Sequence, residues 1–112
     1  MTVFVTQELK FRDHDGRVKP KFDVTPAKQY GAIKFLAPWA PLQAMATQPV
    51  IQAMRSKMAG FCDDDYLLPV GNPVIQSMAA AIAASINIGR VKFLLWDRQQ
   101  QGYLEIHADL YK

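Results

Sequence analysis

A strand, a capped helix and a second strand follow one another in the second half of the chain, and this order constrains the fold most. Residues 66–70 are a short apolar run, Asn72 is a favourable N-cap, and Pro73 takes the first helical position, where a missing N–H costs little. A helix rich in small residues runs to about Asn87, and residues 91–96 form the near-continuous apolar run of an interior strand. The segment predicts a βαβ unit with a right-handed parallel crossover.

Antiparallel hairpins are expected at both ends of the chain. Residues 2–12 alternate with period two and predict a half-buried strand, in which Phe11 faces inward. A turn over residues 13–16 leads to a second strand at 17–24, where Pro20 indicates a sheet edge. The last strand is predicted at residues 103–111. Its core-facing positions are expected to be Leu104, Ile106, Ala108 and Leu110.

Between these parts, residues 32–37 read as a short strand, and an amphipathic helix is expected to start with Thr47 as N-cap and Pro49 in its first turn. A chain of 112 residues suits one domain, which buries about 60–70% of its unfolded surface. We therefore predict a single compact α/β domain over residues 1–112. It has a small mixed sheet with one parallel βαβ crossover, two main helices and antiparallel hairpins at the ends.

The composition excludes several classes of protein. Cys62 is the single cysteine, so an internal disulfide cannot form. The longest apolar run, residues 78–86, is far shorter than the roughly 18 residues that span a bilayer, and the first residues do not resemble a signal peptide. We expect a soluble, cytoplasmic protein that does not associate with membranes.

Five cations of the N-terminal hairpin form the first candidate site. Residues 1–40 hold all of the net charge of +3, and a four-residue turn would place Arg12 opposite Arg17 and Lys10 opposite Lys19 on one face. Opposed like charges cost stability, which an anionic partner such as nucleic acid would offset. Alternatively, the cations protect an exposed edge strand against aggregation. The candidate residues are Lys10, Arg12, Arg17, Lys19 and Lys21.

The turn before the second helix forms another candidate, for an anion or nucleotide. Gly71, Asn72 and the N–H of Val74 lie at a helix N-terminus, which attracts phosphate. Asp97 follows the next strand, where an acidic residue would contact a ribose. The segment lacks both G-x-G-x-x-G and the Lys-Ser/Thr of a P-loop, so ordinary helix capping is the alternative interpretation.

The remaining polar residues do not form a recognisable catalytic or metal motif. Asp63–Asp65 and Asp13–Asp15 lack the spacing of known metal sites, and we expect them to be structural turns. Acidic neighbours disfavour a reactive thiolate at Cys62. We assign no catalytic residue, metal or cofactor, and whether the protein is an enzyme stays open, with a non-enzymatic role favoured.

Three segments carry a family resemblance: residues 22–31 (FDVTPAKQYG), 65–73 (DYLLPVGNP) and 96–99 (WDRQ). Together they resemble a group of small uncharacterised proteins encoded by tailed bacteriophages, over most of the chain beyond about residue 20. The resemblance implies a setting, the cytoplasm of an infected bacterium, and it supplies no activity and no catalytic residues.

The leading hypothesis is a non-enzymatic binding or regulatory accessory protein. It would engage a host or phage protein, or nucleic acid, through the basic hairpin or a sheet edge. The first alternative is a small nucleotide- or phosphate-binding protein or enzyme that uses Gly71 and Asn72, and the second is a minor virion component. Because a small sheet leaves unpaired edges, a homodimer or higher oligomer is also expected.

Overall fold

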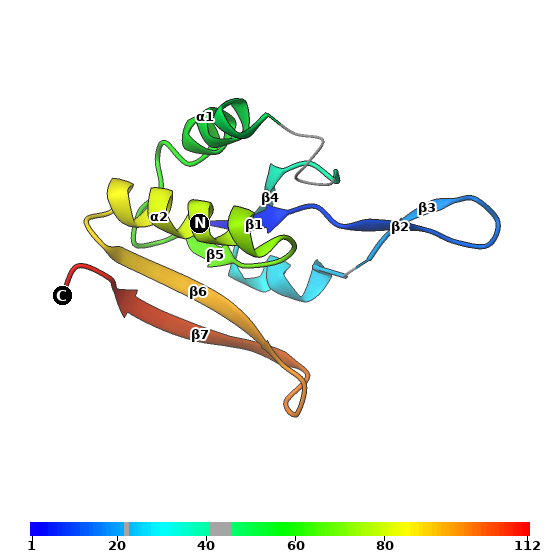
Figure 1. Cartoon of the computed structure of the whole chain (residues 1–112). Coiled ribbons are helices and arrows are strands. Elements are labelled where there is room, and N and C mark those ends of the chain that lie inside the picture. The colour runs from blue at the N-terminus through cyan, green and yellow to red at the C-terminus, as the bar shows by residue number, and fades with distance from the viewer. Residues whose placement is uncertain (22, 41–45) are drawn as a thin grey trace.

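A five-stranded mixed sheet in the order β4-β1-β5-β6-β7 forms the centre of the structure (Figure 1). The computed structural model describes residues 1–21, 23–40 and 46–112. The four strands from β4 to β6 are parallel and β7 is antiparallel to β6, so the predicted mixed α/β fold is confirmed. The strands are β1 (Thr2–Gln7), β4 (Ala32–Ala37), β5 (Tyr66–Leu68), β6 (Arg90–Asp97) and β7 (Gly102–Asp109).

Two α-helices, α1 (Thr47–Lys57) and α2 (Pro73–Ile86), pack on one face of the sheet. The α2 helix connects β5 to its parallel neighbour β6, which confirms the predicted crossover. The Asn72 side chain accepts a hydrogen bond from the Val74 N–H at 2.8 Å, so the predicted cap is also confirmed. At α1 the prediction was wrong by one position, because the N-cap is Ala46 and Thr47 is already helical.

The opposite face of the sheet has a much smaller cover. A short 3-10 helix, η1 (Thr25–Tyr30), lies on this face and precedes β4 in the chain. Its Ala27 is fully buried in a second apolar cluster with Val3, Val5 and Leu94, and the Tyr30 ring packs edge-on against Tyr66. The two faces of the sheet are therefore covered by layers of very different size.

The first strand differs from its prediction. β1 ends at Gln7, and it lies between two parallel neighbours with a layer on each face, so Phe4 and Thr6 are as buried as Val3 and Val5. The expected half-buried strand over residues 2–12 was wrong. Period-two alternation shows which side chains share a face, but it does not show whether the other face is covered.

Beyond β1 the chain leaves the sheet and forms a separate antiparallel pair, β2 (Lys10–Arg12) and β3 (Val18–Pro20). This β2–β3 ribbon projects away from the body of the protein (Figure 1). The predicted N-terminal hairpin therefore exists, as a protruding arm. Phe22, part of its predicted second strand, lies outside the described residues.

The C-terminal hairpin is paired as expected, but its apolar side is largely uncovered. Leu104 and Ile106 were predicted to face the core, yet they are 36% and 43% exposed, and Leu110 is also exposed. They lie on the helix side of the sheet, beyond the strands that α1 and α2 cover.

Among the described residues, no helix has the length and apolarity needed to cross a bilayer.

Candidate functional site

The turn of the β2–β3 ribbon is held by Asp13. The Asp13 N–H donates to the Arg17 carbonyl at 2.9 Å, and the Gly16 N–H donates to the Asp13 carbonyl at 3.0 Å. The Asp13 carboxylate also accepts from the N–H groups of Asp15 and Arg17. Gly16 has a φ of 79°, which closes the three-residue loop of a bulged hairpin.

This turn changes the strand register that was predicted. Arg12 lies opposite Val18, and Lys10 lies opposite Pro20, so the expected pairs of opposed cations do not form. The prediction was wrong because it counted Asp13 as a loop residue, whereas Asp13 pairs with Arg17. A change of one residue in loop length moves every partner by one position.

The corrected register also divides the cations between the two faces of the ribbon. Lys10 and Arg12 lie on one face, and Lys19 lies on the other, opposite Phe11. The same register continues to Arg17, which pairs with Asp13, and to Lys21, whose backbone N–H donates to the Leu9 carbonyl at 2.8 Å. Arg17 and Lys21 therefore lie on the face of Lys19. The expectation of one basic face was therefore wrong, and the ribbon is basic on both sides.

Two of the five cations have acidic partners within the ribbon. Lys10 Nζ lies 2.9 Å from Glu8 Oε1, and Lys19 Nζ lies 3.0 Å from Asp13 Oδ2. The Lys19 ammonium, with the N–H groups of Arg17 and Asp15, lowers the pKa of Asp13 from its ordinary value. Lys10 and Glu8 are both partly exposed, and such ion pairs contribute little to stability, so a phosphate group can compete for Lys10. The Asp13 side chain is only 9% exposed, and its pair with Lys19 is part of the turn.

Phe11 is a site residue that the sequence analysis missed. It was predicted to face inward, but it is 44% exposed on the ribbon, and Val18 is 42% exposed on the opposite face. The alternating pattern placed Phe11 on the core-facing side of a strand. It is exposed because the ribbon projects from the body of the protein, which the pattern does not show. An apolar side chain between cations is a common feature of nucleic-acid-binding surfaces.

A groove of about 640 Å³ opens at the base of the ribbon, on the sheet face opposite the α-helices. Its floor is apolar and comes from the sheet, including Val5, Ile33 and Phe35. Its walls carry Lys19 of the ribbon and Lys28 of η1 together with the acidic Glu8 and Asp23, so the formal charges of these four residues balance. The groove is therefore apolar at its floor and mixed in charge at its walls.

The switch point of the sheet lies between β1 and β5, where successive connections run to opposite sides of β1. Ligands of open α/β proteins bind there, at the carboxyl ends of the strands. In this protein the buried Gln7 side chain occupies the position. Its Oε1 accepts from the Asn72 N–H at 2.9 Å, and its Nε2 donates to the carbonyls of Pro38 and Ala40 at 3.3 and 3.1 Å.

The predicted anion-site residues have internal partners. The N–H groups of Asn72 and Val74 bond to Gln7 and to the Asn72 side chain, and Pro73 has no N–H. Gly71 lines a second groove of about 550 Å³, whereas Asp97 accepts from the Gln99 N–H at 3.0 Å in the next turn. These contacts are those of a helix cap and a turn, and they support the capping interpretation.

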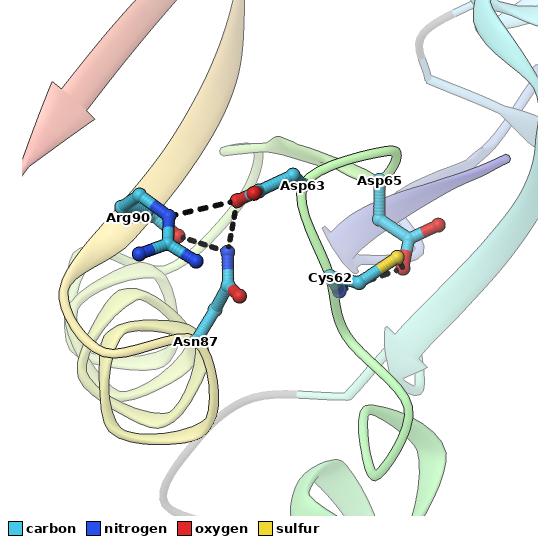
Figure 2. A network of polar contacts seen from close by, with 5 residues as sticks. All are labelled: Cys62, Asp63, Asp65, Asn87 and Arg90. Carbon is cyan, nitrogen blue, oxygen red and sulfur yellow. Dashed lines mark hydrogen bonds and ion pairs between the residues drawn. The ribbon is translucent and has the colours of Figure 1, made fainter.

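The acidic run 63–65 holds a loop in place (Figure 2). Asp63 Oδ1 accepts from Asn87 Nδ2 at 2.8 Å and from Arg90 Nε at 3.0 Å, and these two donors lower its pKa. Asp65 accepts from the N–H of Cys62 and from that of Thr2. In the part of the chain that is described, groups of three or more potential metal-ligating side chains are absent.

Comparisons with known proteins gave one match. A protein-family model described as "Phage Pam3 gp32-like protein" matches residues 1–110. The comparisons with curated proteins and with solved structures gave no match. The matched range covers the sheet, both helices and the ribbon, so the resemblance to small phage proteins is confirmed.

Replacing Gly71 with alanine should destabilise the fold more than the same change at Gly16. Both glycines have positive φ, which costs alanine about 1–2 kcal/mol. A Cβ at Gly71 would also clash with the Gln7 side chain, whereas a Cβ at Gly16 meets no atom within 4 Å. Overpacking should add about 1–3 kcal/mol at Gly71 only. Chemical denaturation checks this, and equal losses would show that Gln7 can move aside.

Replacing Asp63 with asparagine should lower the unfolding temperature at neutral pH. Because the folded-state pKa of Asp63 is lowered, its contribution is present above its ordinary pKa of 3.8 and is lost as the pH falls through the folded value. The difference between the two proteins should therefore shrink below about pH 4. Thermal unfolding across this range measures it, with Asp64→Asn at the exposed neighbouring position as the control. A difference independent of pH would contradict the assignment.

Proposed function

The chain belongs to the Phage Pam3 gp32-like protein family, and on this premise we propose that it is a phage accessory protein that binds nucleic acid through the β2–β3 ribbon. One observation carries the proposal: the ribbon projects from the body and has cations on both faces (Figure 1). A protein that binds through a flat surface needs cations on one face only.

A two-stranded ribbon has the dimensions of the major groove of DNA, which is about 12 Å wide. Inside a groove, such a ribbon meets the phosphates of one strand on one side and those of the other strand on the other side. Lys10 and Arg12 are positioned for one backbone, and Arg17, Lys19 and Lys21 for the other. The division of the cations, which argues against a flat basic surface, therefore supports insertion into a groove.

The exposed apolar residues of the ribbon fit the same partner. Phe11 can stack on a base or enter between base steps, as apolar wedges of other nucleic-acid-binding proteins do. Without a partner, an exposed phenylalanine on a projecting arm contributes little to stability, because little of its apolar surface is buried. Phe11 lies directly opposite Lys19, on the same face of the ribbon, which places it close to a phosphate-binding group.

The competing ligand site at Gly71 has less support. Gln7 fills the switch point and bonds to the backbone groups there, so a phosphate would have to displace a buried side chain. Arg12, Arg17 and Lys21 of the ribbon, in contrast, are exposed, and only Lys10 and Lys19 would have to exchange an acidic partner for a phosphate. This difference favours a macromolecular partner over a small nucleotide.

Replacing Arg12 and Arg17 with glutamine should weaken nucleic-acid binding, whatever the sequence. Each lost phosphate contact should reduce the slope of log affinity against log salt by about 0.9 on duplex DNA, and therefore by about 1.8 for two contacts. Mobility-shift titrations at several salt concentrations, with duplex and single-stranded DNA and RNA, measure the affinity and the slope.

The matched control is Arg55→Gln with Arg98→Gln, which removes the same charge from two exposed positions outside the ribbon. This control should leave the slope nearly unchanged. If both double variants weaken binding equally, the effect comes from net charge and the ribbon is not the site. Failure of the unmodified protein to shift any probe at low salt would end the proposal and leave a protein partner.

Replacing Phe11 with alanine tests the apolar contact separately from the charges. Loss of one stacked base should weaken binding by about 1–3 kcal/mol, while the salt slope stays unchanged because no cation is removed. The same titrations measure this, and Leu110→Ala at another exposed apolar position is the control. Unchanged affinity would show that Phe11 does not contact the nucleic acid and that the ribbon binds through phosphate contacts alone.

A further inference from the structure

The two edges of the main sheet are protected to different degrees. At the β4 edge, Lys57 at the end of α1 donates from its Nζ to the carbonyls of Phe35 and Leu36, both at 3.3 Å, and so covers part of this edge strand. At the other edge, β7 is eight residues long and lies along the margin of the molecule (Figure 1). Long edge strands are the usual templates for pairing with another chain.

The hydrogen-bond pattern shows which backbone groups of β7 face outward. The Leu110 N–H donates to the Gly89 carbonyl at 2.7 Å, one step beyond the Arg90–Asp109 pair. Because such pairs alternate along an antiparallel ladder, the even-numbered residues of β7 bond to β6. The outward-facing N–H and C=O groups therefore belong to the odd-numbered residues, Tyr103, Glu105, His107 and Asp109.

The side chains of β7 divide in the same way. On the face of η1 lie Glu105 and His107, with Glu105 Oε1 3.7 Å from His107 Nε2. On the helix side lie Leu104, Ile106 and, from β6, Leu95, all of them partly or largely exposed. A second strand at this edge would meet apolar side chains on one face and the polar Glu105 and His107 side chains on the other.

We propose that β7 pairs antiparallel with β7 of a second copy of the chain, around a two-fold axis at Ile106. The pairing joins the two sheets into one continuous sheet. Ile106 lies opposite its own copy, Leu104 lies opposite the partner's Ala108, and Glu105 lies opposite the partner's His107. The outward groups of residues 105 and 107 then form hydrogen bonds across the axis.

Repulsion between carboxylates disfavours the two neighbouring registers. Because a two-fold axis perpendicular to the sheet keeps each face on its own side, residues of the same parity must pair, and the register can change only in steps of two. An axis at Glu105 would place Glu105 opposite its own copy. An axis at His107 would place Glu105 opposite the partner's Asp109. Both arrangements oppose two carboxylates, which is unfavourable.

The position of Glu105 is already determined in the single chain. The Tyr66 hydroxyl donates to Glu105 Oε1 at 2.8 Å, and this contact raises the pKa of Tyr66 to about 12. The carboxylate is therefore held above the edge of the sheet. Its second oxygen is left for the partner's His107.

Cysteine cross-linking tests the register directly. In a Cys62→Ser background, which retains a hydrogen-bond donor to Asp65, Ile106→Cys should form a disulfide-linked dimer under mild oxidation. Opposed residues of a non-hydrogen-bonded pair have Cα atoms about 4.5 Å apart, within the range of a disulfide. Leu104→Cys and Ala108→Cys should cross-link poorly alone, but a mixture of the two should form a heterodimer.

We expect Ile106→Cys to cross-link about tenfold faster than Leu104→Cys alone, because a preformed pair raises the local concentration of the thiols. Equal rates would overturn the register. Light scattering tests the dimer itself: His107→Glu, at an exposed position, should convert it to a monomer by opposing Glu105. A monomer for the unmodified protein at every concentration up to millimolar would overturn the proposal, and this outcome is independent of nucleic-acid binding.

Discussion

The hydrogen bonds of Gln7 hold together the part of the structure on which the rest depends. One buried amide, at the end of the central strand, bonds to the N-terminus of α2 and to the chain that follows β4. Thr6 adds hydrogen bonds with the backbone of Val70. These contacts align the carboxyl ends of three parallel strands, and they occupy the crevice in which related sheet topologies bind a ligand. The same side chain therefore stabilises the fold and fills the switch point between β1 and β5.

The unequal layers on the sheet explain where binding surfaces remain. The α1 and α2 helices bury one face of the strands from β4 to β6, and η1 covers only part of the opposite face. The ribbon extends beyond both layers, and β7 lies beyond the reach of the helices (Figure 1). The two proposed interfaces, one for nucleic acid and one for a second copy, use these uncovered parts. They lie on different elements, so both can be occupied together.

Part of the candidate site was predictable from the sequence. The cations at residues 10–21 and the intervening turn showed that a basic hairpin was present, because turn chemistry and alternation act over a few residues. The distribution of these cations over two faces was not predictable, since it depends on whether Asp13 pairs with Arg17 or belongs to the loop. That choice is made by the Asp13 carboxylate, which bonds to two N–H groups of the turn. The exposure of Phe11 was missed because no local pattern shows that a strand pair leaves its sheet.

The sequence by itself determined the local elements and their class. Asn72 and Pro73 set the start of α2, and the apolar run of residues 91–96 indicated an interior strand, because capping and side-chain polarity act within the segment. The run did not show that Leu95 and Trp96, at its end, are exposed. Only the tertiary structure decided which faces and edges are covered. Burial of Phe4, exposure of Ile106 and the placement of Gln7 in the switch point all depend on residues distant in the chain. Those contacts arise from the packing of whole layers, and a periodicity of two or 3.6 residues carries no information about them.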